Sequence, residues 1–120
     1  MNIKRIKGDA GELYTQKWLR RHRYKITDTN YSCRFGEIDI IAQNKNFICF
    51  VEVKTRASDS LDRPAAAVDL RKQRRIITTA EHFLMGFPCN LQPRFDVAEV
   101  ITDNGKVTSL NYIENAFDLT

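Results

Sequence analysis

An acid and a lysine two residues apart end a strongly apolar segment of this chain, and no other feature constrains the fold as much. The segment Phe47–Val51 is apolar, and Glu52-Val53-Lys54 follows it directly. Because side chains alternate faces along a strand, Glu52 and Lys54 project from the same side. A run that is apolar on both faces is typical of a central strand. The sequence therefore predicts a buried strand that ends in charged residues on one face.

A short turn fixes how this strand meets the one before it. Residues 45–46 predict a two-residue hairpin loop, and antiparallel pairing around that loop sets Asp39 across from Glu52. The same register sets Glu37 across from Lys54. Strict alternation also puts the two acids of the earlier strand on one side. Four charges are then expected to share one face of the hairpin.

Two interpretations of these charges remain open. Two facing carboxylates repel each other and a buried carboxylate bears a desolvation penalty, so a divalent cation between Asp39 and Glu52 would remove both costs. In the other interpretation, Glu37 and Lys54 form an ordinary cross-strand ion pair and the remaining two acids face water. The strand before Glu52 is apolar on both faces, as in a buried central strand, and this favours the cation site.

The first third of the chain predicts a helix followed by three strands in succession. Residues 10–23 predict a helix with Glu12 in its first turn, where an acid commonly complements the helix dipole. Its inward stripe is expected to comprise Ala10, Leu13, Tyr14 and Trp18. Strands are expected over residues 24–31, 36–43 and 47–54, and residues 55–62 are expected to form a loop.

A second helix is expected from Pro64 to Met85, with Asp62 as its cap. Its inward stripe is expected to comprise Val68, Ile76, Ala80, Phe83 and Leu84. Lys72 falls on the same stripe, and its stem either runs along the edge of the core or reaches the acidic face of the hairpin. Three neighbouring arginines make this helix basic: Arg71, Arg74 and Arg75. Two strands over residues 94–101 and 106–113 complete the pattern.

Length, cysteine content and charge narrow the class of protein. The 120 residues predict one domain, 1–120, with no linker. Three cysteines without CxxC spacing predict reduced thiols, and no segment is apolar enough for a leader or a membrane span, so a soluble cytoplasmic protein is expected. Residues 1–25 carry eight Lys or Arg and two acids. This basic start suits contact with a polyanion, although basic patches also serve solubility.

Several stretches of the chain together resemble a known family. Residues 7–117 resemble the YraN (UPF0102) family of small bacterial proteins, which are related to Holliday junction resolvases and to the PD-(D/E)xK nucleases. The resemblance is carried by Gly8–Glu12, Arg34–Ala42, Phe50–Arg56, Ala66–Val68, Lys72–Arg75 and Arg94–Val97. It implies an α/β fold with a restriction-endonuclease-like core, in the order αβββαβ, and a central mixed sheet flanked by helices.

The same resemblance implies a catalytic site. Similar proteins hold one or two Mg²⁺ ions with a helix Glu, a strand Asp and the Glu of the ExK motif, which here are Glu12, Asp39 and Glu52. Lys54 would lie beside the attacking water. Hard carboxylate oxygens suit Mg²⁺ or Mn²⁺, and a nearby positive charge stabilises the charge that develops on phosphate.

We therefore expect a metal-dependent endonuclease that acts on DNA, branched or otherwise structured. Two other functions stay open: a nucleic-acid-binding module of the same fold without turnover, and a protein-interaction domain, which would leave the acids and lysines as coincidence. The partner is expected to be nucleic acid, DNA ahead of RNA, with no membrane, and monomer and homodimer both remain open. Residues expected to contact nucleic acid are Arg34, Arg56, Arg71, Lys72, Gln73, Arg74 and Arg75.

Overall fold

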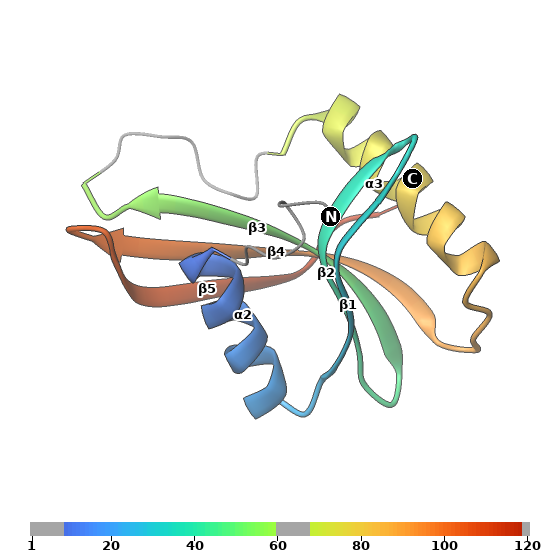
Figure 1. Ribbon diagram of the computed structural model, residues 1–120, viewed down its shortest axis with the longest axis horizontal. Coiled ribbons are helices and arrows are strands. Elements are labelled where there is room, and N and C mark those ends of the chain that lie inside the picture. Colours follow the sequence, from blue (N-terminus) through green and yellow to red (C-terminus); the bar gives the residue numbers. More distant parts are fainter. Residues whose placement is uncertain (1–8, 60–67, 119–120) are drawn as a thin grey trace, which may run out of the picture.

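The computed structural model describes residues 9–59 and 68–118, in which two helices flank one mixed five-stranded sheet (Figure 1). The elements are α2 (Ala10–Arg21), β1 (Lys25–Cys33), β2 (Gly36–Gln43), β3 (Phe47–Ala57), α3 (Leu70–Met85), β4 (Gln92–Asp103) and β5 (Lys106–Phe117). The strands lie in sequence order across the sheet. β3 and β4 run parallel, and the other neighbouring pairs run antiparallel. The predicted α/β fold class is confirmed, and the element order suits a restriction-endonuclease-like core.

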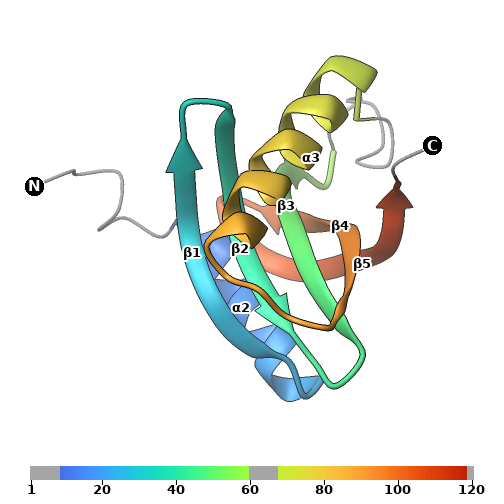
Figure 2. The ribbon, with the colours of Figure 1, turned by 90° about the vertical axis from the view of Figure 1, so that its right-hand side faces the viewer.

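The two helices cover opposite faces of the sheet, each over its own apolar cluster (Figure 2). On one face, Ile76 and Ala80 of α3 pack in the same cluster as Phe50. On the other face, Leu19 of α2 packs in the same cluster as Val51. Because Phe50 and Val51 are neighbours on β3, this strand is buried on both faces, as its sequence predicts.

The inward face of α2 differs from the predicted stripe. Gly11 and Leu19 are buried, whereas Leu13 and Tyr14 are 51% and 37% exposed. The helix approaches the sheet so closely that a Cβ atom on Gly11 would lie 2.6 Å from Thr55 Oγ1. Trp18 packs against the cluster under α2 as predicted, but the prediction for Ala10, Leu13 and Tyr14 was wrong because it ignored this backbone contact.

Several element ends also differ from the prediction, and β1, β4 and β5 each extend beyond their expected last residues. α2 ends at Arg21 rather than at residue 23, since Arg23 has a left-handed φ of 70°. β3 continues to Ala57 through a segment expected to be a loop, because β4 pairs with it along this whole length. The polar sequence after Lys54 gave no sign of that partner strand.

The second helix begins later than expected. Leu70 is its first residue, and the side chain of Asp69 caps it by accepting a backbone hydrogen bond from the first turn. Val68 is buried as predicted, but it lies before the helix. The predicted cap Asp62 and first-turn Pro64 lie outside the described residues.

A buried polar network joins β4, β5 and the start of β1 on the face that α2 covers. Asp96 is fully buried and accepts hydrogen bonds from Arg94, from the Tyr112 hydroxyl at 2.6 Å and from the Asn115 amide. Arg94 also donates to the Tyr24 hydroxyl at 2.6 Å. Because the charged groups of this network have partners, removing one of them would leave a buried charge without its partner, so the network has a structural role.

Two expectations from composition concern thiols and membranes. Cys33, Cys49 and Cys89 are all free thiols, as predicted. No helix in the described part of the chain is long and apolar enough to cross a membrane.

Candidate active site

The candidate site is built where β2 separates from β3. The two strands pair in the predicted register as far as Ile40 and Val51. Beyond that pair, the backbone N–H of Val53 donates to Asp39 Oδ2 at 2.7 Å. Asp39 therefore lies at a fork in the sheet, where its carboxylate accepts a hydrogen bond from the neighbouring strand and the two strands diverge (Figure 1).

The regular alternation of β2 is interrupted at the same place. Ile38 belongs to the cluster under α3 and Ile40 to the cluster under α2, although strict alternation would put both on one face. On β1, Asn30 lies across from this point and has a left-handed φ of 52°. The regular alternation that predicts one face for Glu37 and Asp39 is thus broken between them, and Glu37 is exposed.

Helix α2, which covers the face of the sheet opposite to α3, brings Glu12 to the fork. The carboxylate of Asp9 caps the helix and accepts a hydrogen bond from the Glu12 amide at 2.8 Å, and Gly11 lets this first turn lie against β3. Glu12 is only 9% exposed, and its Oε1 has no hydrogen-bond partner among the described residues. The side chain of Asn30 lies within hydrogen-bonding reach of the Glu12 carboxylate. Buried polar atoms in proteins nearly always have a partner, so an ion or a water molecule would explain this unpaired oxygen.

α3 contributes a cation to the same place. Glu52, on β3, is 8% exposed, and its Oε2 forms an ion pair with the Lys72 ammonium group. Of the two interpretations of Lys72, the structure has the one in which it reaches the acidic face. Lys54 is half-buried and close enough to Lys72 to perturb its pKa. Among residues 9–59 and 68–118, no ion pair joins Glu37 to Lys54.

The three carboxylates act on one another electrostatically. Burial raises the pKa of Asp39 from 3.8 to about 7, and the Glu52 carboxylate adds to the rise. Burial also raises the pKa of Glu12, and the charges of Asp9, Glu37 and Glu52 add to that rise. Perturbation by burial and by like charges is typical of a site that binds a cation or transfers a proton.

The donor set fits a hard divalent cation, but its members have other partners here. In the described part of the chain, no group of three His, Cys, Asp or Glu side chains is placed to hold a metal ion directly. Glu52 is paired with Lys72, and Asp39 accepts the hydrogen bond from Val53, while Glu12 keeps an unpartnered oxygen. Carboxylate oxygens suit Mg²⁺ and Mn²⁺. Among the described residues, these carboxylates are the ones whose chemistry suits such an ion.

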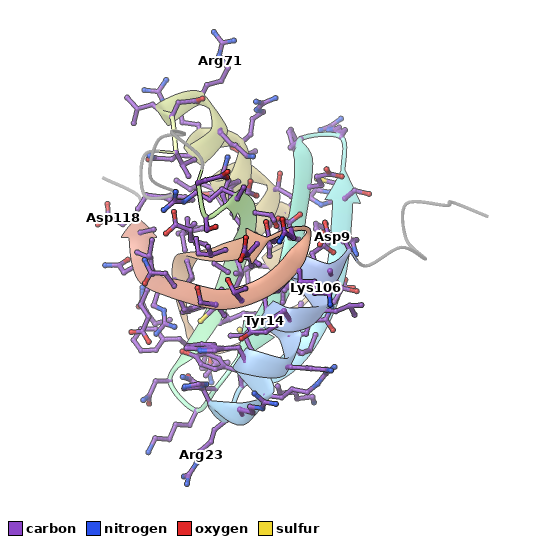
Figure 3. All side chains as sticks on the ribbon, turned by 90° about the vertical axis from the view of Figure 1, so that its left-hand side faces the viewer. Asp9, Tyr14, Arg23, Arg71, Lys106 and Asp118 are labelled. Carbon is purple, nitrogen blue, oxygen red and sulfur yellow. The ribbon has the colours of Figure 1, made fainter. Side chains whose placement is uncertain are left out.

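The residues predicted to contact nucleic acid fall into two groups. Arg34, at the β1–β2 turn, is exposed, as are three arginines of α3, which we call the α3 arginines: Arg71, Arg74 and Arg75. Figure 3 shows Arg71 extending away from the body of the protein. By contrast, Arg56 pairs with Glu99 at 2.9 Å, and Gln73 donates to the Val68 carbonyl at 2.6 Å. The structure therefore gives these two side chains partners within the fold.

The sequence analysis did not identify two features that position the site. Asp9 and Glu12 have the spacing of a helix N-cap and its third residue, and this pattern would have shown how the first turn is fixed. Asn30 tolerates a left-handed conformation better than most residues, but within a weakly patterned strand this signal is too weak to interpret.

Comparisons with known proteins agree with the sequence resemblance. A model of the uncharacterised protein family UPF0102 matches residues 11–100. A UPF0102 protein of Caldanaerobacter subterraneus is 42% identical over 117 residues, covering 95% of this chain and 96% of the relative. Another, of Clostridium acetobutylicum, is 42% identical over 114 residues, 93% of each chain. A third, of Alkaliphilus metalliredigens, is 44% identical over 111 residues, 92% of this chain and 96% of the relative.

Proposed function

This chain belongs to the uncharacterised protein family UPF0102, and we propose that it is a metal-dependent endonuclease that hydrolyses phosphodiester bonds in DNA. The substrate class that we propose is branched or otherwise structured DNA, which the resemblance to Holliday junction resolvases implies. The family name itself carries no activity. The proposal therefore depends on the chemistry of the site.

The observation that carries the proposal is the electrostatic coupling of three carboxylates, which come from three elements around one fork of the sheet. Glu12 comes from α2, Asp39 from β2 and Glu52 from β3. Burial and the charge of Glu52 raise the pKa of Asp39 to about 7, although the Val53 amide donates a hydrogen bond to its carboxylate. A divalent cation would remove the repulsion.

The chain's own residues have distinct roles in this proposal. Glu12, Asp39 and Glu52 would hold Mg²⁺ or Mn²⁺, and the Val53 amide fixes the orientation of the central carboxylate. When bound, such an ion supplies an activated water near neutral pH and neutralises charge on the transferring phosphoryl group. Lys54 would position the attacking water and stabilise charge on phosphate, because an ammonium group has no lone pair to offer a metal.

Nucleic acid would approach across the basic end of α3. The α3 arginines are exposed and lie on the helix that also brings Lys72 to the carboxylates. Phosphate contacts of this kind position a duplex without reading its sequence. Arg34 projects from the β1–β2 turn next to the same helix, since the following Phe35 packs against His82 of α3.

A cleavage panel tests the proposed function. The protein is incubated with linear, flapped and four-way DNA and with structured RNA, in Mg²⁺, Mn²⁺ or EDTA. We expect cleavage of DNA that EDTA abolishes, and a loss of about a hundredfold or more in Asp39→Asn and Glu52→Gln. Glu81→Gln, which changes an exposed acid of α3, is the matched control and should cleave like the wild type.

The second candidate function is a nucleic-acid-binding module without turnover. The Lys72–Glu52 ion pair favours it, because a lysine that permanently neutralises Glu52 would leave no place for a metal. Binding of the same DNA panel without cleavage in any metal would select this function. If the protein neither binds nor cleaves any of these substrates, the third function, a protein-interaction domain, would be selected.

A further inference from the structure

Lys72 pairs with one of the three carboxylates that would hold the proposed ion. Its ammonium group pairs with Glu52, whose side chain is almost fully buried, while the Lys72 side chain is 37% exposed. Burial lowers the pKa of Lys72, but the contact with Glu52 and the charge of Asp39 outweigh burial and raise it. The lysine is therefore a firmly charged cation that faces two of the three carboxylates.

Among the residues that the structure describes, no other cation pairs with these carboxylates. In the described part of the chain, Lys72 is the only Lys or Arg that forms an ion pair with Glu12, Asp39 or Glu52. In the metal-free protein, the positive charge that offsets the repulsion among these carboxylates thus comes from Lys72 of α3. The lysine side chain has four rotatable bonds, so its ammonium group can move.

A second position for the same ammonium group lies close by. A hollow of about 200 Å³ is lined by Gly36, Glu37, Lys72, Arg75 and Ile76. Glu37 is exposed and forms no ion pair among the described residues. The Glu37 carboxylate thus lines the same hollow as Lys72 and could accept its ammonium group.

We propose that Lys72 is a built-in substitute for the metal: it neutralises Glu52 in the metal-free protein, and the incoming divalent cation displaces its ammonium group toward Glu37. This inference rests on the proposed function, since it assumes that the carboxylates bind a metal. A divalent cation bound beside Glu52 and the Lys72 ammonium group would repel each other, because both are positively charged and would share one carboxylate. The measured metal affinity then includes the cost of opening the ion pair.

Isothermal titration of the full chain with Mn²⁺ tests the displacement. Lys72→Met keeps the length of the side chain but removes the competing charge, so Mn²⁺ should bind about tenfold or more tightly than in the wild type. Arg75→Met is the matched control, because Arg75 lines the same hollow without contacting the carboxylates, and its affinity should change by about twofold or less. Equal changes in the two variants, or weaker binding in Lys72→Met, would overturn the proposal.

A double-mutant cycle tests the second position. Glu37→Gln should weaken Mn²⁺ binding several-fold, because the displaced lysine loses its partner. In the Lys72→Met background the same change should have little effect, since no ammonium group needs to move. An equal effect in both backgrounds would show that Glu37 acts only through its general charge.

A measurement on the wild type avoids dependence on variants. The side-chain ¹⁵N resonance of the Lys72 ammonium group should shift on addition of Mg²⁺, with the same midpoint as metal binding. A resonance that does not move while metal binds would overturn the displacement.

The outcomes separate this inference from the proposed function. If the wild type binds no Mn²⁺, both fall. If DNA is cleaved but Lys72→Met and the resonance show no competition, only the displacement falls. If Lys72→Met tightens Mn²⁺ binding but no substrate is cleaved, the displacement stands and the nuclease function falls.

Discussion

Substituting asparagine for Asp39 should stabilise the metal-free protein at pH 8, although it changes the centre of the candidate active site. Burial and the Glu52 carboxylate raise the pKa of Asp39 from 3.8 to about 7. The unfolded chain loses this proton at about pH 4, whereas the folded protein keeps it until about pH 7. Wild-type stability therefore falls as pH rises through this window and levels off above it. Asparagine accepts the same Val53 hydrogen bond without a charge, so the variant avoids this loss.

The size of the gain follows from the two pKa values. The difference of about 3 pKa units between 3.8 and 7 corresponds to about 4 kcal/mol at about 1.4 kcal/mol per unit, which is an upper limit. Water at the half-buried Asp39 and local relaxation reduce this value. We expect the free energy of unfolding to rise by about 1–3 kcal/mol at pH 8 and hardly at all at pH 4.

Urea unfolding in EDTA at pH 4 to 9 measures this difference directly. Asp59→Asn, a change at an exposed carboxylate, is the control and should show no such pH dependence. Adding Mg²⁺ at pH 8 should stabilise the wild type by mass action and leave Asp39→Asn unchanged. A stability difference that does not vary with pH, or a variant that is less stable than the wild type at pH 8, would refute the argument.

Three further predictions concern chemistry, binding and packing. Lys54→Ala should keep the affinities for Mn²⁺ and DNA within a few-fold of the wild type but slow single-turnover cleavage about a hundredfold. Lys54→Arg should restore this rate only in part. Cleavage by Lys54→Ala at the wild-type rate would show that this lysine has no catalytic role. Replacing the α3 arginines with glutamine should weaken DNA binding and flatten its salt dependence, and an unchanged slope would move the binding surface to the basic α2. Gly11→Ala should lower the free energy of unfolding by about 1–3 kcal/mol, because the new Cβ atom meets Thr55 Oγ1, and Thr55→Ala should restore part of the loss in urea titrations.

The hairpin that carries the site was predictable because its determinants are local. Asn44 accepts hydrogen bonds from the amides of Asn46 and Phe47, which closes the two-residue loop that the sequence predicts. From that loop, counting residues is enough to bring Asp39 and Glu52 to the same level of the sheet. The family resemblance added the carboxylate from the first helix.

The remaining features depend on contacts between segments far apart in the sequence. The orientation of α2 depends on the approach of Gly11 to Thr55, and the length of β3 depends on pairing with β4. The pairing of Lys72 with Glu52 depends on how α3 packs on the sheet, so periodicity placed the lysine on the inward stripe but left its partner open. No local pattern contains this information.

The parallel pairing of β3 with β4 also has a consequence for the rate at which the protein folds. Every residue pair along it, from Phe47 with Gln92 to Ala57 with Thr102, joins positions 45 residues apart in the sequence. The hairpins on either side close over short turns, which takes microseconds, whereas this central pairing must wait for a long loop to close. We expect its formation to limit the folding rate. Truncating Val53, which pairs across it with Ala98, should then slow folding, whereas changes confined to β5 should mainly speed unfolding.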